Sequence, residues 1–141
     1  MKIYSIFLLT FSLLLMVACD KKDGILSFKL DTPFELKIGE SATLEDQADV
    51  QIRFDKVLSD SRCPIDAECV WAGRAEIEVT FFQEGQSATT TLIMGDHTGT
   101  GYTEKAVFGI YTVTLKAVRP EPKADQPIPV GDYRIELEVS K

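Results

Sequence analysis

Three kinds of side chain in this sequence have the chemistry for a site: a pair of cysteines, the acidic residues around them, and a single histidine. Cys63 and Cys69 are separated by five residues, whereas zinc sites usually use four ligands with closer cysteine spacings. The pair also lacks the Cys-x-x-Cys spacing of redox-active cysteines. We therefore expect neither a metal centre nor a redox centre here, and no cofactor.

Four carboxylates accompany the cysteine pair. Calcium binds six to eight oxygen atoms, and clustered acidic residues can supply several of them. The spacing of these residues matches no EF-hand loop. We therefore expect solvated loop acids rather than a metal site at Asp55, Asp60, Asp66 and Glu68.

His97 is the only histidine and lies in the glycine-rich segment 95–101. A general base needs a nucleophile and an orienting group beside it, and the sequence names no such set. The Gly-x-Ser-x-Gly elbow of many hydrolases is also missing. We assign no catalytic residue and expect no enzyme. The alternative is a small hydrolase that uses acidic residues or His97.

The elements that position these residues follow an apolar N-terminal segment. Residues 1–18 contain fourteen apolar side chains and one charged residue, Lys2. A membrane-spanning helix needs about 20 apolar residues, so this run is too short. It is typical of a secretory signal peptide. The sequence therefore predicts an exported protein.

The end of this segment, Met16-Val17-Ala18-Cys19, resembles the lipobox of bacterial lipoproteins. The resemblance implies that the signal peptide is cleaved before Cys19 and that a lipid is attached to the Cys19 thiol. Residues 19–26 would then be the lipidated N-terminus and tether. Each buried CH₂ contributes roughly 0.8 kcal/mol, so several acyl chains hold a domain at a membrane.

With Cys19 lipidated, Cys63 and Cys69 remain as an even pair in an exported chain, which predicts one disulfide. We expect Trp71 to pack in the core beside it, as aromatic residues do over the cystines of immunoglobulin-like sandwiches. The alternative is that Trp71 is an exposed anchor at a binding surface.

Apolar and polar residues alternate with a period of two through the chain after residue 26, which predicts half-buried strands. Only one face of each strand is apolar, and this favours antiparallel sheets. We predict an all-β fold, a single antiparallel β-sandwich of immunoglobulin-like class over residues 27–141, with an open β-barrel as the alternative. The seven clearest of seven or eight expected strands are 34–38, 41–44, 50–55, 75–81, 87–94, 110–118 and 133–139.

Two connections between strands are also predicted. Residues 83–86 have the length and the glycine of a hairpin turn, so strands 75–81 and 87–94 should pair. Residues 120–129 contain four prolines, which cannot donate ladder hydrogen bonds, so this segment should cross between strands as an extended linker.

Residues 60–73 contain Asp60-Ser61-Arg62-Cys63-Pro64, then Cys69, then Val70-Trp71-Ala72-Gly73. They resemble a motif of small, functionally uncharacterised exported bacterial proteins, many of them lipoproteins. The resemblance covers about fourteen residues and implies one exported β domain with a disulfide loop. It implies no reaction, ligand or catalytic residue.

The charge balance excludes nucleic acid as a partner, because 22 acidic and 15 basic side chains give a net charge of -7. We expect a lipoprotein anchored to a membrane of the bacterial cell envelope, at the periplasmic face or the cell surface. It would act as a binding or structural module for an envelope protein or a glycan. A loop that inhibits a protease is an alternative form of such a module.

Loops at the ends of β-sandwiches commonly carry recognition, because the sheets hold them in place. We expect binding at loop 58–73 and at the glycine-rich segment 95–101. Arg62 is expected to lock its loop through charge-assisted hydrogen bonds to Asp60 and Asp66. The candidate binding residues of the first loop are Asp60, Arg62, Pro64, Asp66, Glu68 and Trp71.

Overall fold

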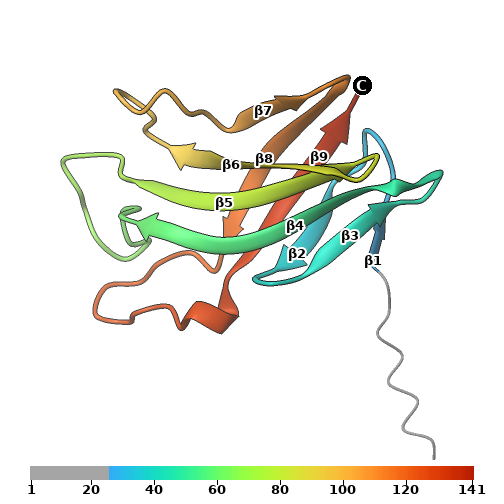
Figure 1. The fold of residues 1–141 in the computed structure, drawn as a ribbon. Coiled ribbons are helices and arrows are strands. Elements are labelled where there is room, and N and C mark those ends of the chain that lie inside the picture. The colour runs from blue at the N-terminus through green and yellow to red at the C-terminus, as the bar shows by residue number, and fades with distance from the viewer. Residues whose placement is uncertain (1–25) are drawn as a thin grey trace, which may run out of the picture.

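The computed structural model describes residues 26–141 (Figure 1). The predicted signal peptide of residues 1–18, the predicted lipidation site Cys19 and all but the last residue of the predicted tether lie outside the described residues. In the described part, no helix is long and apolar enough to cross a membrane.

The described chain forms two sheets that lie face to face and do not close into a barrel (Figure 1). The predicted β-sandwich is therefore confirmed, and the open barrel is not formed. The strands pair in the predicted antiparallel manner, except that Leu26–Phe28 runs parallel to Ser41–Leu44. The first sheet has the order β1 (Leu26–Phe28), β3 (Ser41–Leu44), β4 (Gln47–Asp60), β5 (Arg74–Gln83) and β6 (Gln86–Gly95). The second has the order β2 (Phe34–Lys37), β9 (Arg134–Ser140), β8 (Tyr111–Arg119) and β7 (Lys105–Phe108). A short 3₁₀ turn, η1 (Val130–Asp132), precedes β9.

The alternating sequence pattern produces the core between the two sheets. In β4, Val50, Ile52 and Phe54 are fully buried, while the residues between them are partly exposed. Antiparallel pairing continues this inward face across the sheet, with Ile52 opposite the buried Phe81. Complete burial of such a side chain contributes roughly 1.5–3 kcal/mol, so these positions supply much of the stability of the sandwich.

The β5–β6 hairpin has the predicted pairing. Gln83 lies opposite Gln86, and Glu84 and Gly85 form a two-residue turn with positive φ angles of 50° and 75°. Two-residue turns of this kind match the twist of the flanking strands, and glycine adopts positive φ without steric cost. The turn fixes the register of β5 and β6, which pair without interruption to Gly95.

Two irregularities in the pairing of β4 with β5 explain why β4 is longer than the predicted strand 50–55. The register shifts between Phe54 and Lys56 and again between Val57 and Ser59. A bulge inserts an extra residue and interrupts the period of two while the strand continues. The strand therefore extends to Asp60, where it delivers the chain to the cysteine-containing loop.

Candidate functional site

Three connections meet at the end of the sandwich where β4 ends and β5 begins. We call them the disulfide loop (residues 61–73), the glycine loop (residues 96–101) and the proline loop (residues 120–129). The backbone N–H of Ile65 donates to the carbonyl oxygen of Pro122 over 3.0 Å. On the other side, the N–H of Asp96 donates to the carbonyl oxygen of Gly73 over 3.1 Å. The disulfide loop is therefore held by both neighbouring loops.

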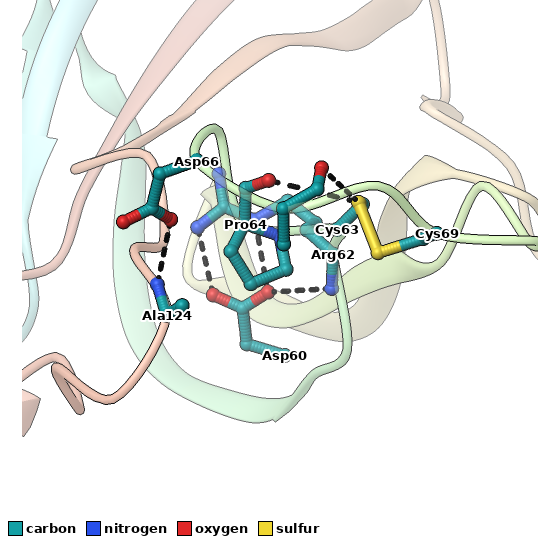
Figure 2. Close-up of a disulfide and its surroundings, with 8 residues drawn as sticks. Asp60, Arg62, Cys63, Pro64, Asp66, Cys69 and Ala124 are labelled. Carbon is teal, nitrogen blue, oxygen red and sulfur yellow. Dashed lines mark hydrogen bonds and ion pairs between the residues drawn. A yellow bond between two sulfur atoms is a disulfide. The ribbon is translucent and has the colours of Figure 1, made fainter.

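The predicted disulfide between Cys63 and Cys69 is present, with the two Cα atoms 5.9 Å apart (Figure 2). The bond closes a short ring inside the disulfide loop. It restricts the conformations of the segment that carries Ile65, Asp66 and Glu68. The remaining residues of the loop, Val70 to Gly73, connect this ring to β5.

Arg62 joins the disulfide loop to the second sheet. Its guanidinium group contacts the Asp60 carboxylate at two points, Nε to Oδ1 over 2.9 Å and Nη2 to Oδ2 over 2.7 Å. It also donates to the backbone carbonyl oxygens of Val118, over 2.6 Å, and Pro120, over 3.0 Å. The two charged side chains are only 10% and 8% exposed. The expected pairing of Arg62 with Asp60 is therefore present, and it connects β4 to the end of β8.

Tyr133, just before β9, completes this group, and we refer to it as the Asp60–Arg62–Tyr133 network. The Tyr133 hydroxyl donates to Asp60 Oδ2 over 3.1 Å. Burial by itself would raise the pKa of Asp60, but the hydrogen bonds and positive charge of Arg62, together with the Tyr133 hydroxyl, outweigh it and hold that pKa below its usual value. Burial and the nearby Asp60 charge raise the pKa of Tyr133. The network is therefore a charged pair with a neutral phenol at neutral pH.

Asp66 has a different partner from the one we expected. Its Oδ1 accepts a hydrogen bond from the backbone N–H of Ala124 over 2.7 Å, and it makes no ion pair with Arg62 (Figure 2). Together with the bond from Ile65 to Pro122, this contact fastens the proline loop to the disulfide loop. The proline loop connects two adjacent strands, β8 and β9, as the predicted linker. Its length allows it to reach the disulfide loop on the way.

Gly73 closes the neck of the disulfide loop. Its φ of +66° lies in the left-handed region, and a Cβ atom at this position would clash with the backbone of Ser61. The Ser61 N–H donates to the Arg74 carbonyl oxygen over 2.7 Å directly beside it. The two ends of the loop approach each other so closely that only glycine fits.

The expectation that Trp71 packs in the core is wrong. Its side chain is 65% exposed, and the neighbouring Val70 is 94% exposed. The Asp60–Arg62–Tyr133 network, rather than an aromatic ring, connects the loop to the second sheet. Ile65, on the other side of the disulfide, is 64% exposed. We refer to Ile65, Val70 and Trp71 as the apolar tip.

The remaining predicted site residues do not gather into one cluster. Pro64 is partly buried beside the proline loop, and Glu68 is exposed. Asp55 lies on β4, where its Oδ2 accepts a hydrogen bond from the Thr80 hydroxyl over 2.6 Å. His97 is exposed on the glycine loop, and its carbonyl oxygen accepts a bond from the Thr100 hydroxyl. Among residues 26–141, no three acidic, histidine or cysteine side chains form a group that could hold a metal ion.

Comparison with family models, with curated proteins and with solved structures finds no match for this chain. The geometry of the disulfide loop is thus the main observation on which a function can be argued.

Proposed function

We propose that this protein is a lipid-anchored binding module of the bacterial cell envelope, and that the apolar tip contacts its partner. The exposure of Val70 and Trp71 on a loop with a fixed shape carries this proposal. The packing of the fold does not by itself explain why Trp71 is exposed. A surface role explains both its position and that of its neighbour.

The physical cost of this arrangement favours a binding role. Apolar area in contact with water costs roughly 25 cal/mol per Å², so an exposed Trp and Val next to each other in the chain, and an exposed Ile in the same loop, are unfavourable until something covers them. Clustered apolar side chains surrounded by polar residues mark interaction sites. Tryptophan is also one of the residue types that dominate binding energy at interfaces.

The loop is prepared for binding before a partner arrives. The disulfide, the Asp60–Arg62–Tyr133 network and the contacts to the proline loop hold it from three sides. A surface that is already ordered loses little conformational entropy on association, and this raises affinity without additional contacts.

The charges beside the tip indicate the chemistry of the partner. Asp66 and Glu68 are exposed within the ring closed by the disulfide. Such carboxylates disfavour contact with an anionic membrane surface. They favour an envelope protein or glycan with an apolar recess and a neutral or basic rim.

Affinity capture from the cell envelope tests this proposal. The bait is the lipidated wild-type protein, compared with a Val70→Ser/Trp71→Ala variant. Val107→Ser is the matched control, because Val107 is 72% exposed on β7, in the other sheet. We expect one specific partner to be lost with the tip variant and kept with the control. Mass spectrometry verifies that Cys63 and Cys69 remain linked in each bait. Recovery of the same partners by both variants would show that the tip is not the binding surface.

A further inference from the structure

The outer edge of β6 has the features of a strand-binding site. β6 pairs with β5 from Gln86 to Gly95 without a bulge and is the last strand of its sheet. Backbone groups on one side of such a strand bond to the neighbouring strand, and those on the other side point away from the sheet.

The residues that point outward can be identified from one hydrogen bond. The N–H of Ile93 donates to the carbonyl oxygen of Thr103 over 2.9 Å, away from β5. Because the direction alternates along a strand, the backbone groups of Ser87, Thr89 and Thr91 point the same way. Within residues 26–141 these groups have no backbone partner on that side. We call residues 86–92 the open edge.

The open edge is accessible from Gln86 to Thr91, whereas Leu92 is buried. Residues 86–89 are all exposed, including Ala88, which lies opposite the buried Phe81 and therefore faces the gap between the sheets. A hollow of about 310 Å³ beside it has Phe81 and Phe108 among its lining residues. Phe108, the last residue of β7, lines this hollow, and residues 86–89 remain exposed beside it.

Edge strands in folded proteins are normally protected by charged side chains, prolines, bulges or short length. The sequence of β6, QSATTTLIMG, contains no charged residue and no proline, and its pairing with β5 has no bulge. The other described edge strands, β1, β2 and β7, have only three or four residues each. β6 is thus the edge of the described domain that is suited to accept another strand.

We propose that the open edge binds the open edge of a second copy of this chain, as an antiparallel pair with its two-fold axis at Thr89. This axis places Thr89 opposite Thr89 of the second copy and Ser87 opposite Thr91. The lack of charge favours this occupant, because a charged strand would bring like charges together in such a symmetric pair. The outward-pointing residues without a backbone partner, Ser87, Thr89 and Thr91, are also symmetric about Thr89, since the Ile93 N–H already bonds to Thr103.

Cross-linking of the full-length protein in detergent tests the position of the axis. In an antiparallel pair, directly opposite residues have Cα atoms about 4.5–5.5 Å apart, which is within the range for disulfides. We expect Thr89→Cys to give a disulfide-linked dimer after mild oxidation, as seen on a non-reducing gel. The wild type, which carries Cys19, sets the background, and Val107→Cys on β7 is the control. Absence of the linked dimer, or equal yields from both variants, would overturn the proposal.

A proline substitution tests the backbone pairing itself. In Thr91→Pro the lost N–H points outward, so the β5–β6 ladder stays intact. We expect sedimentation to show a dimer for wild type and for Thr91→Ala, and at least tenfold weaker association for Thr91→Pro. Thermal melting checks that each variant is folded. A monomeric wild type, or equal association of both Thr91 variants, contradicts the proposal. If Val70→Ser/Trp71→Ala loses dimerisation and Thr91→Pro keeps it, the dimer contact is at the apolar tip, and this result also overturns the proposal.

Discussion

At the scale of the residue, Arg62 determines how the candidate site is held. A single guanidinium group meets the Asp60 carboxylate, the backbone carbonyl oxygen of Val118 in β8 and that of Pro120 in the proline loop. Arginine suits this place because its planar group donates in several fixed directions, which a lysine ammonium does not reproduce. Asp60 and Arg62 therefore support the binding surface from below, whereas Val70 and Trp71 form it.

Replacement of Arg62 by methionine should destabilise the protein by about 3 kcal/mol, because removal of one partner leaves a buried charge unpaired. Chemical denaturation measures this loss. Arg119→Met is the control, since the Arg119 side chain is 53% exposed and lies 3.9 Å from Glu136. Exposed pairs of this kind contribute less than about 1 kcal/mol. Equal losses in the two variants would show that the Asp60–Arg62–Tyr133 network does not hold the loop.

Sequence reasoning at this scale succeeded for the pairing of Arg62 with Asp60, but failed for Asp66 and for partners distant in the chain. Asp60 and Arg62 are two residues apart, so their pairing could be expected from charge alone. Tyr133 is 73 positions from Asp60, and no pattern in the sequence connects them. The burial expected for Trp71 came from its proximity to a cystine. Its exposure depends on what fills the space beneath the loop, which only the folded chain decides.

At the scale of the element, the disulfide loop depends on the backbone at its neck as much as on its side chains. Gly73 adopts a positive φ where a Cβ atom would strike the Ser61 backbone. Gly99 has a similar φ of +76°, but a Cβ atom there would meet nothing within 4 Å. A comparison of the two positions therefore separates the cost of a positive φ angle from the cost of a clash with the Ser61 backbone.

Gly73→Ala should destabilise the protein clearly more than Gly99→Ala. Both substitutions carry the left-handed penalty of about 1–2 kcal/mol, and Gly73→Ala adds a clash with main chain that cannot move aside easily. Equilibrium unfolding of the two variants measures the difference. If both alanine variants lose the same stability, the proposed close contact between Gly73 and the Ser61 backbone is contradicted.

Element prediction followed the length and regularity of each strand. The seven clearest predicted strands are all present, because a period of two over four or more residues with one apolar face is a strong signal. β1 and β7 were not predicted, since three and four residues give too little alternation to recognise. The extension of β4 to Asp60 was also missed, because its bulges interrupt the alternation.

At the scale of the whole molecule, the chain enters the domain far from the apolar tip. Leu26 lies opposite Ala42, and Ala42 opposite Ile52, so the entry point is eight residues before the end of β4. At about 3.3 Å per residue, the disulfide loop begins roughly 26 Å further along the sheet. Residues 19–25 could extend about 24 Å from a membrane at about 3.5 Å per residue. An anchor at Cys19 would therefore be joined to the sheet at a point away from the apolar tip.

The lipid anchor itself can be tested on the same scale, because the proposed function requires the domain to stay at a membrane. Radiolabelled palmitate should be incorporated into the wild type and lost completely in Cys19→Ser, since the thiol of Cys19 is the proposed attachment point. The double variant Cys63→Ser/Cys69→Ser is the matched control and should keep the label, because these thiols are joined in a disulfide. Cell fractionation should then find the Cys19→Ser variant outside the membrane fraction, as a domain without acyl chains has no comparable affinity for the bilayer. Equal labelling of wild type and Cys19→Ser would exclude this anchor. The apolar tip would then have to act in a protein that is free of the membrane or is held there in another way.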